Sequence, residues 1–310
     1  MKIVFMGTPD FAVEPLEAIL AAGYQIELVV SQPDKPKGRG KKLQPTPVKE
    51  AAEKHGIEVY QPIKLNTAEA YDKIKAIEPD IIIVVAYGQI LRENILQLPR
   101  LGCYNIHASL LPKYRGAAPI QWAIINGDRE TGITIMKMER GLDSGDMLLK
   151  RQVAILPDMN AEELHDNLCI EGGKAIVEAL DILENKAYTL TPQNHELFTY
   201  APMLDKELGR IQWQNNVETI HNLIRGVYPW PGAFTLYKGQ NMKVLKARIE
   251  DKSYGKPCGT VCQVNKNGIW VQAQDSCIVI EMIQFPGKKA MFVRDYLAGN
   301  ELENNIVLGE

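Results

Sequence analysis

The chain has 310 residues, of which 45% are hydrophobic and 24% charged, with a formal net charge of −3 at pH 7. This composition is ordinary for a globular protein and excludes a disordered, collagen-like or coiled-coil chain as the main description. The longest nearly unbroken apolar run, residues 81–87, is far shorter than the ~20 residues of a membrane-spanning helix, so we expect no membrane contact. The five cysteines are sparse and odd in number, which argues against a disulfide scaffold and favours a reduced, cytoplasmic protein.

Strand-like and helix-like segments alternate through the first half of the chain. The run Ile-Ile-Ile-Val-Val within residues 80–86 has the unbroken apolar character of a strand buried on both faces. Such alternation predicts an α/β fold with a Rossmann-like, doubly wound, mostly parallel sheet, whose ligands bind beyond the carboxyl ends of the strands. In chain order we expect strands at 2–6, 25–31, 58–60, 80–86 and 102–106, and helices at 11–22, 47–55, 67–77 and 119–126.

The pattern then changes twice. Two strand-like runs, 131–138 and 147–154, precede a long amphipathic helix at 160–185. Periodicity fades around residue 190, and the C-terminal third is strand-rich and net basic, whereas the rest of the chain is net acidic. Short strands separated by turns predict a small β-barrel of the OB type. We therefore expect a catalytic domain at 1–189, a linker at 190–207 and an OB-like domain at 208–310. The expected C-terminal strands are 234–237, 242–249, 259–264, 269–273 and 277–284.

Asn105 and His107 stand where a predicted strand enters a loop. If the strand continues through His107, both side chains share a face, because strand side chains repeat every two residues. An amide donor beside an imidazole can stabilise an oxyanion and shuttle a proton. The alternative is structural: an asparagine that caps the loop and a histidine that is hydrogen-bonded within it.

The loop at residues 139–146 carries two glycines and several carboxylates. Asp143 and Asp146 together offer too few oxygen ligands for Mg²⁺ or Ca²⁺, so we expect no metal site. Acids and glycines are also ordinary turn residues. A carboxylate from this loop that reached His107 would set the tautomer of its imidazole.

Five of the eight residues 35–42 are basic, and none is acidic. Proline and glycine make this segment a loop, and its charge suits either a solvated surface or contact with phosphate or nucleic acid.

Trp230, flanked by prolines, either stacks on a base or packs at a domain junction. The first strand is followed by Gly-Thr-Pro, which lacks the glycine fingerprint of dinucleotide binding.

Taken together, these segments resemble the folate-dependent formyltransferases over almost the whole chain. The central motif NIHASLLPKYRGAAPIQWAI is specific to that family, and the basic loop and C-terminal segments narrow the resemblance to its tRNA-acting members. The resemblance rests on residues 6–16, 32–49, 86–91, 105–124, 131–148, 199–213 and 222–234.

The resemblance implies transfer of the formyl group of 10-formyltetrahydrofolate to the α-amino group of methionine on initiator tRNA, by a protein that we expect to be a monomer. It implies a catalytic trio of Asn105, His107 and Asp143. The implied tetrahydrofolate site consists of Ser109, Leu110, Leu111 and Pro112, with Gln89, Ile90, Leu91 and the Asp143 loop lining the pterin pocket. The implied contacts to the tRNA acceptor stem are Lys37, Arg39, Lys41 and Lys42, and the OB-like domain at 208–310 is implied to bind tRNA as well.

Three rival functions remain open. An enzyme that formylates an amino sugar, or that hydrolyses the formyl donor, would keep the same trio without needing the basic loop. A non-catalytic RNA-binding protein would bind RNA in a salt-dependent way that is insensitive to His107. A nucleotide-sugar or dinucleotide enzyme would use the Rossmann-like half, and the missing glycine fingerprint counts against it.

Overall fold

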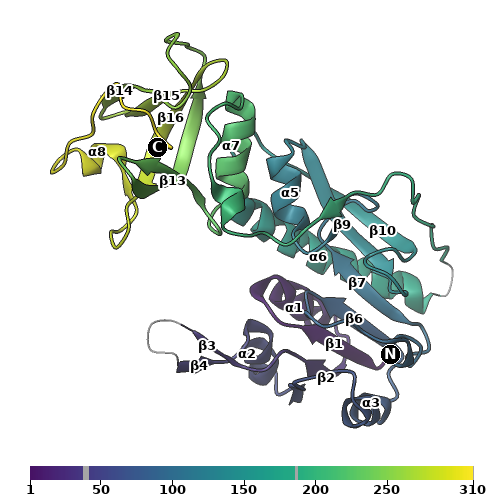
Figure 1. Ribbon diagram of the computed structural model, residues 1–310. Coiled ribbons are helices and arrows are strands. Elements are labelled where there is room, and N and C mark those ends of the chain that lie inside the picture. The colour runs from purple at the N-terminus through teal and green to yellow at the C-terminus, as the bar shows by residue number, and fades with distance from the viewer. Residues whose placement is uncertain (38–41, 186–187, 310) are drawn as a thin grey trace. The chain divides into compact units, whose positions relative to one another are not determined.

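The structure is a computed structural model that describes residues 1–37, 42–185 and 188–309. It consists of two compact units (Figure 1). Both units are discontinuous along the chain, and the predicted limits 1–189, 190–207 and 208–310 stay a prediction. The first unit contains Met1–Gly116, Thr131–Ala154 and His165–Ala201, and the second contains Ala117–Glu130, Ile155–Leu164 and Pro202–Glu310.

A seven-stranded sheet forms the centre of the first unit, in the order β10-β9-β7-β6-β1-β2-β5 (Figure 1). The pairs β1–β2, β1–β6, β2–β5 and β6–β7 are parallel, and β7–β9 is antiparallel. The predicted Rossmann-like, mostly parallel sheet is therefore confirmed. Its strands are β1 (Ile3–Gly7), β2 (Ile26–Val30), β5 (Val59–Tyr60), β6 (Ile81–Val85), β7 (Cys103–His107), β9 (Glu130–Lys137) and β10 (Met147–Ala154).

Helices pack against this sheet because its central strands, β1 and β6, are apolar on both faces. Every residue of β1 and β6 is buried, and for β6 the unbroken apolar run predicted this. Val4 and Ile82 share one core cluster with Ile74 of α3. Threonine side chains cap two helices, since Thr46 accepts the first-turn N–H of α2 and Thr67 that of α3. The helices of this unit are α1 (Val13–Ala21), α2 (Pro47–Lys54), α3 (Ala68–Lys75), α4 (Glu93–Leu96) and most of α6 (Ala161–Glu184).

The second unit is built on an antiparallel sheet in the order β12-β13-β16-β15-β14, with β17 paired to β16. The predicted C-terminal strands are confirmed within one residue or two at each end, while their closure into an OB-like barrel stays a prediction. The strands are β12 (Ala233–Tyr237), β13 (Gln240–Glu250), β14 (Val261–Asn265), β15 (Gly268–Gln272), β16 (Cys277–Gln284) and β17 (Met291–Phe292).

The second unit also contains α7 (Val217–Gly226), a helix that the sequence analysis did not predict. It buries Val217, Ile220 and Ile224 in the same apolar core as the inner residues of β13 and β16. The shorter helices α5 (Pro119–Ile125) and α8 (Val293–Tyr296) belong to this unit as well. Trp230, which follows α7, is 55% exposed.

Candidate active site

The site begins at the carboxyl end of β7, where the sheet topology favours ligand binding. His107 is the last residue of this strand and pairs with Thr134 of β9, and Asn105 lies two residues earlier. His107 is 5% exposed, whereas Asn105 is half-buried. The predicted strand therefore does extend through His107, and its period of two places both side chains on one face.

The imidazole of His107 is held by two groups. Its Nε2 atom lies 2.9 Å from the carbonyl oxygen of Tyr114. Because a carbonyl oxygen only accepts, Nε2 carries the hydrogen and donates it. The other ring nitrogen, Nδ1, lies 3.7 Å from Asp143 Oδ2. An imidazolium at this position would thus direct its two N–H groups at a carbonyl and a carboxylate.

The carboxylate of Asp143 joins the two β7 side chains. Asn105 Nδ2 donates to Oδ1 at 3.4 Å, and the backbone N–H of Gly116 donates to Oδ2 at 2.9 Å. Asp143 itself has a φ of 47°, in the left-handed region that aspartate tolerates better than most residues. The structure therefore brings together the three residues of the expected trio, which are 38 positions apart at their extremes.

Gly145 explains why the Asp143 loop can approach the sheet so closely. A Cβ atom at this position would lie 1.8 Å from the carbonyl oxygen of Lys137, at the end of β9. The backbone carbonyl of the next residue, Asp146, accepts a hydrogen bond from the Lys137 N–H at 2.8 Å. The glycine is thus required by steric contact with the strand, in addition to any turn preference.

The segment after His107 folds back on β9 through Thr134. Its hydroxyl donates to the Ser109 carbonyl at 2.6 Å and accepts the Leu111 N–H at 3.1 Å. The Ser109 hydroxyl donates to the carbonyl of Lys113 at 2.6 Å. Internal hydrogen bonds therefore hold both the backbone and the serine side chain of this loop.

The residues that were expected to bind folate differ in the solvent exposure of their side chains. Ile90 is 84% exposed, and Leu110 and Pro112 are half-buried. Leu111 and Leu91 are buried, at 0% and 6% exposure. The accessible apolar surface in this set therefore comes from Ile90, Leu110 and Pro112.

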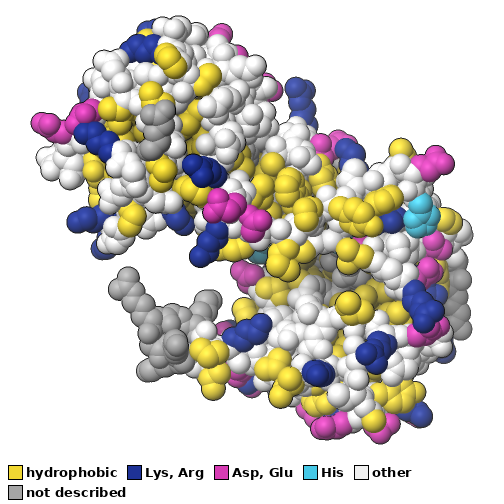
Figure 2. Space-filling view, in the orientation of Figure 1, with side chains coloured by type: hydrophobic (Ala, Val, Ile, Leu, Met, Phe, Trp, Pro, Cys, Tyr) yellow, Lys and Arg dark blue, Asp and Glu magenta, His cyan; other side chains and the backbone are white. Residues whose placement is uncertain are grey.

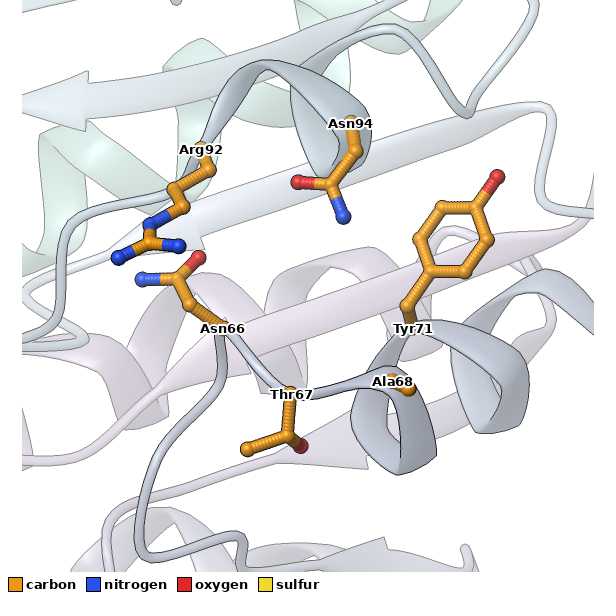
Figure 3. Close-up of a pocket in the computed structure, with 6 residues that line it drawn as sticks. All are labelled: Asn66, Thr67, Ala68, Tyr71, Arg92 and Asn94. Carbon is orange, nitrogen blue, oxygen red and sulfur yellow. The ribbon is translucent and has the colours of Figure 1, made fainter.

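The side chain of Gln89 supports the chain in front of α3. Its Oε1 accepts the Leu65 N–H at 2.8 Å, and its Nε2 donates to the Ile63 carbonyl at 3.3 Å. A surface pocket opens beside this segment (Figure 3), where Asn66 Nδ2 donates to the Ile90 carbonyl at 2.9 Å. None of the residues that line this pocket belongs to the expected site: Asn66, Thr67, Ala68, Tyr71, Arg92 and Asn94.

The basic loop is only partly described. Arg39 and Lys41 lie outside the described residues. Lys37 and Lys42 pair through their backbones as the ends of a short antiparallel hairpin, β3 (Lys35–Lys37) and β4 (Lys42–Gln44). On the face shown in Figure 2, the Lys and Arg side chains of the C-terminal unit stand among apolar ones, without forming a single continuous patch.

Within residues 1–37, 42–185 and 188–309, no group of three or more His, Cys, Asp or Glu side chains is arranged to hold a metal ion. Within the same residues, no helix combines the length and the apolar character needed to cross a bilayer.

Some groups at the site carried no recognisable signal in the sequence. The Tyr114 carbonyl and the Gly116 N–H are backbone atoms, and no side-chain pattern in the sequence marks them. Arg115 and Gln193 are buried polar side chains that meet beside the Asp143 loop, with Arg115 Nη2 2.7 Å from Gln193 Oε1. Gln193 stands in the segment that was expected to be a linker.

Comparisons with known proteins cover the whole chain. The formyl transferase family model matches residues 1–180, and the model of the formyl transferase C-terminal domain matches residues 203–301. The methionyl-tRNA formyltransferase of Clostridioides difficile is 52% identical over 309 residues, covering 100% of both chains.

Solved structures support the fold. The methionyl-tRNA formyltransferase of Clostridium thermocellum superposes with a TM-score of 0.58 at 18% identity, covering 92% of this chain and 98% of its own. HypX from Aquifex aeolicus, in complex with tetrahydrofolic acid, gives a TM-score of 0.63 at 17% identity, covering 96% of this chain and 47% of its own.

Proposed function

The chain belongs to the formyl transferase family, and we propose that it transfers the formyl group of 10-formyltetrahydrofolate to the α-amino group of methionyl initiator tRNA. The product is formylmethionyl-tRNA for translation initiation. Proteins of this family use folate derivatives. The observation that carries the assignment is the 52% sequence identity to a methionyl-tRNA formyltransferase over the full length of both chains. The contacts among Asn105, His107 and Asp143 support it.

The reaction forms one C–N bond and breaks another. The α-amino nitrogen of methionine attacks the formyl carbon, and the carbonyl oxygen becomes an oxyanion in the tetrahedral intermediate. Asn105 is proposed to donate to this oxyanion, because its amide has two N–H groups and the contact with Asp143 uses one of them. Removing one such donor typically costs a factor of ~10²–10³ in rate.

The attacking amine must also lose a proton before the donor is released. We propose that Asp143 and His107 move this proton, directly or through one water, toward the N10 atom that departs as the C–N10 bond breaks. The 3.7 Å separation of His107 Nδ1 and Asp143 Oδ2 supports this role. The imidazolium would in addition stabilise the oxyanion, and the Tyr114 carbonyl would keep the ring oriented.

We propose that the donor binds beside the trio, on the loop that follows β7 and on residues 89–91. The exposed side chain of Ile90 and the half-buried Leu110 and Pro112 offer apolar surface to the pterin ring. Ser109, Leu111 and Gln89 are engaged in internal contacts, so they would act by shaping the pocket.

The basic loop is proposed to contact the tRNA acceptor stem through Lys37, Arg39, Lys41 and Lys42. Its support is charge density, since five of the eight residues 35–42 are basic. The Arg39→Ala variant should mainly weaken the use of charged tRNA. A variant that altered only folate affinity would contradict this assignment. We propose that the enzyme works as a monomer in the cytoplasm. All five cysteines are free, which is compatible with a reducing compartment.

The direct test incubates the purified protein with 10-formyltetrahydrofolate and initiator tRNA charged with radiolabelled methionine, and scores formylmethionine. An elongator methionyl-tRNA and an amino-sugar nucleotide serve as alternative acceptors, and free tetrahydrofolate release is followed without acceptor. Formylation of the initiator alone is the expected result. Formylation of the sugar, or donor hydrolysis without an acceptor, would replace the proposed function with the corresponding rival.

A further inference from the structure

Residues 191–201, here called the strap, run along both loops that hold the catalytic groups. At one end, Thr191 exchanges two backbone hydrogen bonds with Met147, the first residue of β10, at 2.8 and 2.9 Å. At the other end, Thr199 accepts the Tyr114 N–H through its hydroxyl and the Arg115 N–H through its carbonyl, at 2.9 and 2.8 Å. The strap therefore joins the chain just after the Asp143 loop to the chain just after His107.

Between these ends, Gln193 points into the site rather than into solvent, and it is 4% exposed. Its Nε2 donates to the carbonyl oxygens of Asp143 at 2.9 Å and Gly145 at 2.8 Å. Its Oε1 accepts from Arg115, through Nε at 3.0 Å and Nη2 at 2.7 Å. Two donors and two acceptor positions are the full capacity of a glutamine amide, so this side chain is completely satisfied.

Arg115 connects Gln193 with Gly116, the residue that binds the Asp143 carboxylate. Its buried guanidinium also donates to His195 Nδ1 at 3.1 Å and lies over the ring of Phe198, with 5.1 Å between the guanidinium carbon and the ring centre. The residue after it, Gly116, donates its N–H to Asp143 Oδ2. The backbone of Asp143 is thus held by Gln193, while its carboxylate is held by the neighbour of the arginine that Gln193 binds.

We propose that Gln193 is a positioning residue for Asp143 in the formyl transfer reaction, an inference that rests on the proposed function. Asp143 stands in a loop with a left-handed backbone, and its carboxylate must stay within reach of both Asn105 and His107. A displacement of about 1 Å at a reacting group can cost about a hundredfold in rate. Gln193 supplies two hydrogen bonds that fix the loop against such a displacement.

The test replaces the hydrogen-bond donors of the Gln193 side chain with acceptors. Gln193→Glu keeps an acceptor for Arg115 but removes both N–H groups, so two carbonyls face a carboxylate. We expect kcat to fall about tenfold to hundredfold, with little change in the KM for either substrate. The matched control is Asn194→Ala, in the same strap, because the exposed Asn194 side chain accepts only the N–H of Glu196 among its described contacts. The control should keep wild-type kcat.

A double-mutant cycle separates positioning from general damage. If Gln193 acts through the Asp143 carboxylate, then Gln193→Glu costs little further activity in an Asp143→Ala background. Equal losses in both backgrounds, or an unchanged kcat in Gln193→Glu alone, would overturn the proposal. Gln193→Met repeats the cycle without a buried charge, in case the glutamate variant unfolds. Wild-type protein that formylates no tRNA in the same assay would instead contradict the proposed function.

Discussion

A single methyl group at residue 145 should displace the catalytic carboxylate. The Cβ of a Gly145→Ala variant would lie 1.8 Å from the Lys137 carbonyl oxygen, where an ordinary carbon–oxygen contact is about 3.3–3.6 Å. The strand end is held in the sheet, so the loop is the part that yields, by roughly 1.5 Å. Asp143, two residues away, now lies 3.7 Å from His107 Nδ1 and would move out of reach of it.

We therefore expect Gly145→Ala to lower kcat about a hundredfold or more. Overpacking of this kind should also cost about 1–3 kcal/mol of unfolding free energy. The assay is steady-state formylation at saturating concentrations of the donor and of initiator methionyl-tRNA, with calorimetry to verify folding. Gly299→Ala is the control, because a Cβ there would meet no atom within 4 Å from the described residues beyond its chain neighbours. A folded Gly145→Ala variant with wild-type kcat would refute the argument that the glycine sets the place of Asp143.

Three further predictions follow from individual side chains. His107→Ala should abolish transfer while tRNA binding survives in a filter assay, and wild-type turnover would contradict the mechanism. Burial, and then the Arg225 guanidinium, lower the pKa of His221 below 6.5. The unfolded chain then binds more protons, so the unfolding free energy falls as pH drops below about 6.5, and His221→Gln should reduce that fall in urea titrations. Burial raises the pKa of the Cys103 thiol to about 12, so iodoacetamide at pH 8 should label half-buried Cys258 and spare Cys103, as peptide mass spectrometry would show.

Local sequence patterns were sufficient to predict the central sheet and to propose two of the three residues of the trio. The apolar run in β6 and the period of two in β7 act between near neighbours, so the sequence indicated both strands and the shared face of Asn105 and His107. The pattern of the 139–146 loop offered several carboxylates, and only the resemblance singled out Asp143. Its contact with β7 depends on a close approach of this loop to β9 that a glycine at position 145 permits. A contact of this kind depends on the tertiary structure, so local sequence patterns do not predict it.

The missed helix α7 had a readable signal. Val217, Ile220 and Ile224 follow helical spacing, and Asn216 caps the first turn by accepting the Thr219 N–H. The many strand-like segments of the C-terminal third obscured this short helical pattern.

The strap is a different case, because its residues show neither helical nor strand periodicity. Their order comes from hydrogen bonds to residues about fifty to eighty positions away, and periodicity analysis does not detect these.

The chemistry of residue 193 narrows the choice of side chain at that position. Two backbone carbonyls and a guanidinium converge there, so the residue must donate twice and accept twice without adding a buried charge. Lysine and arginine offer donors but no acceptor, and an ionised glutamate offers acceptors but no donor. Asparagine has the right groups on a shorter stem and would leave one side of the network unpaired, at a cost of about 1–3 kcal/mol. Glutamine alone spans both sides, which is why a residue in a segment without periodicity can still be structurally specific.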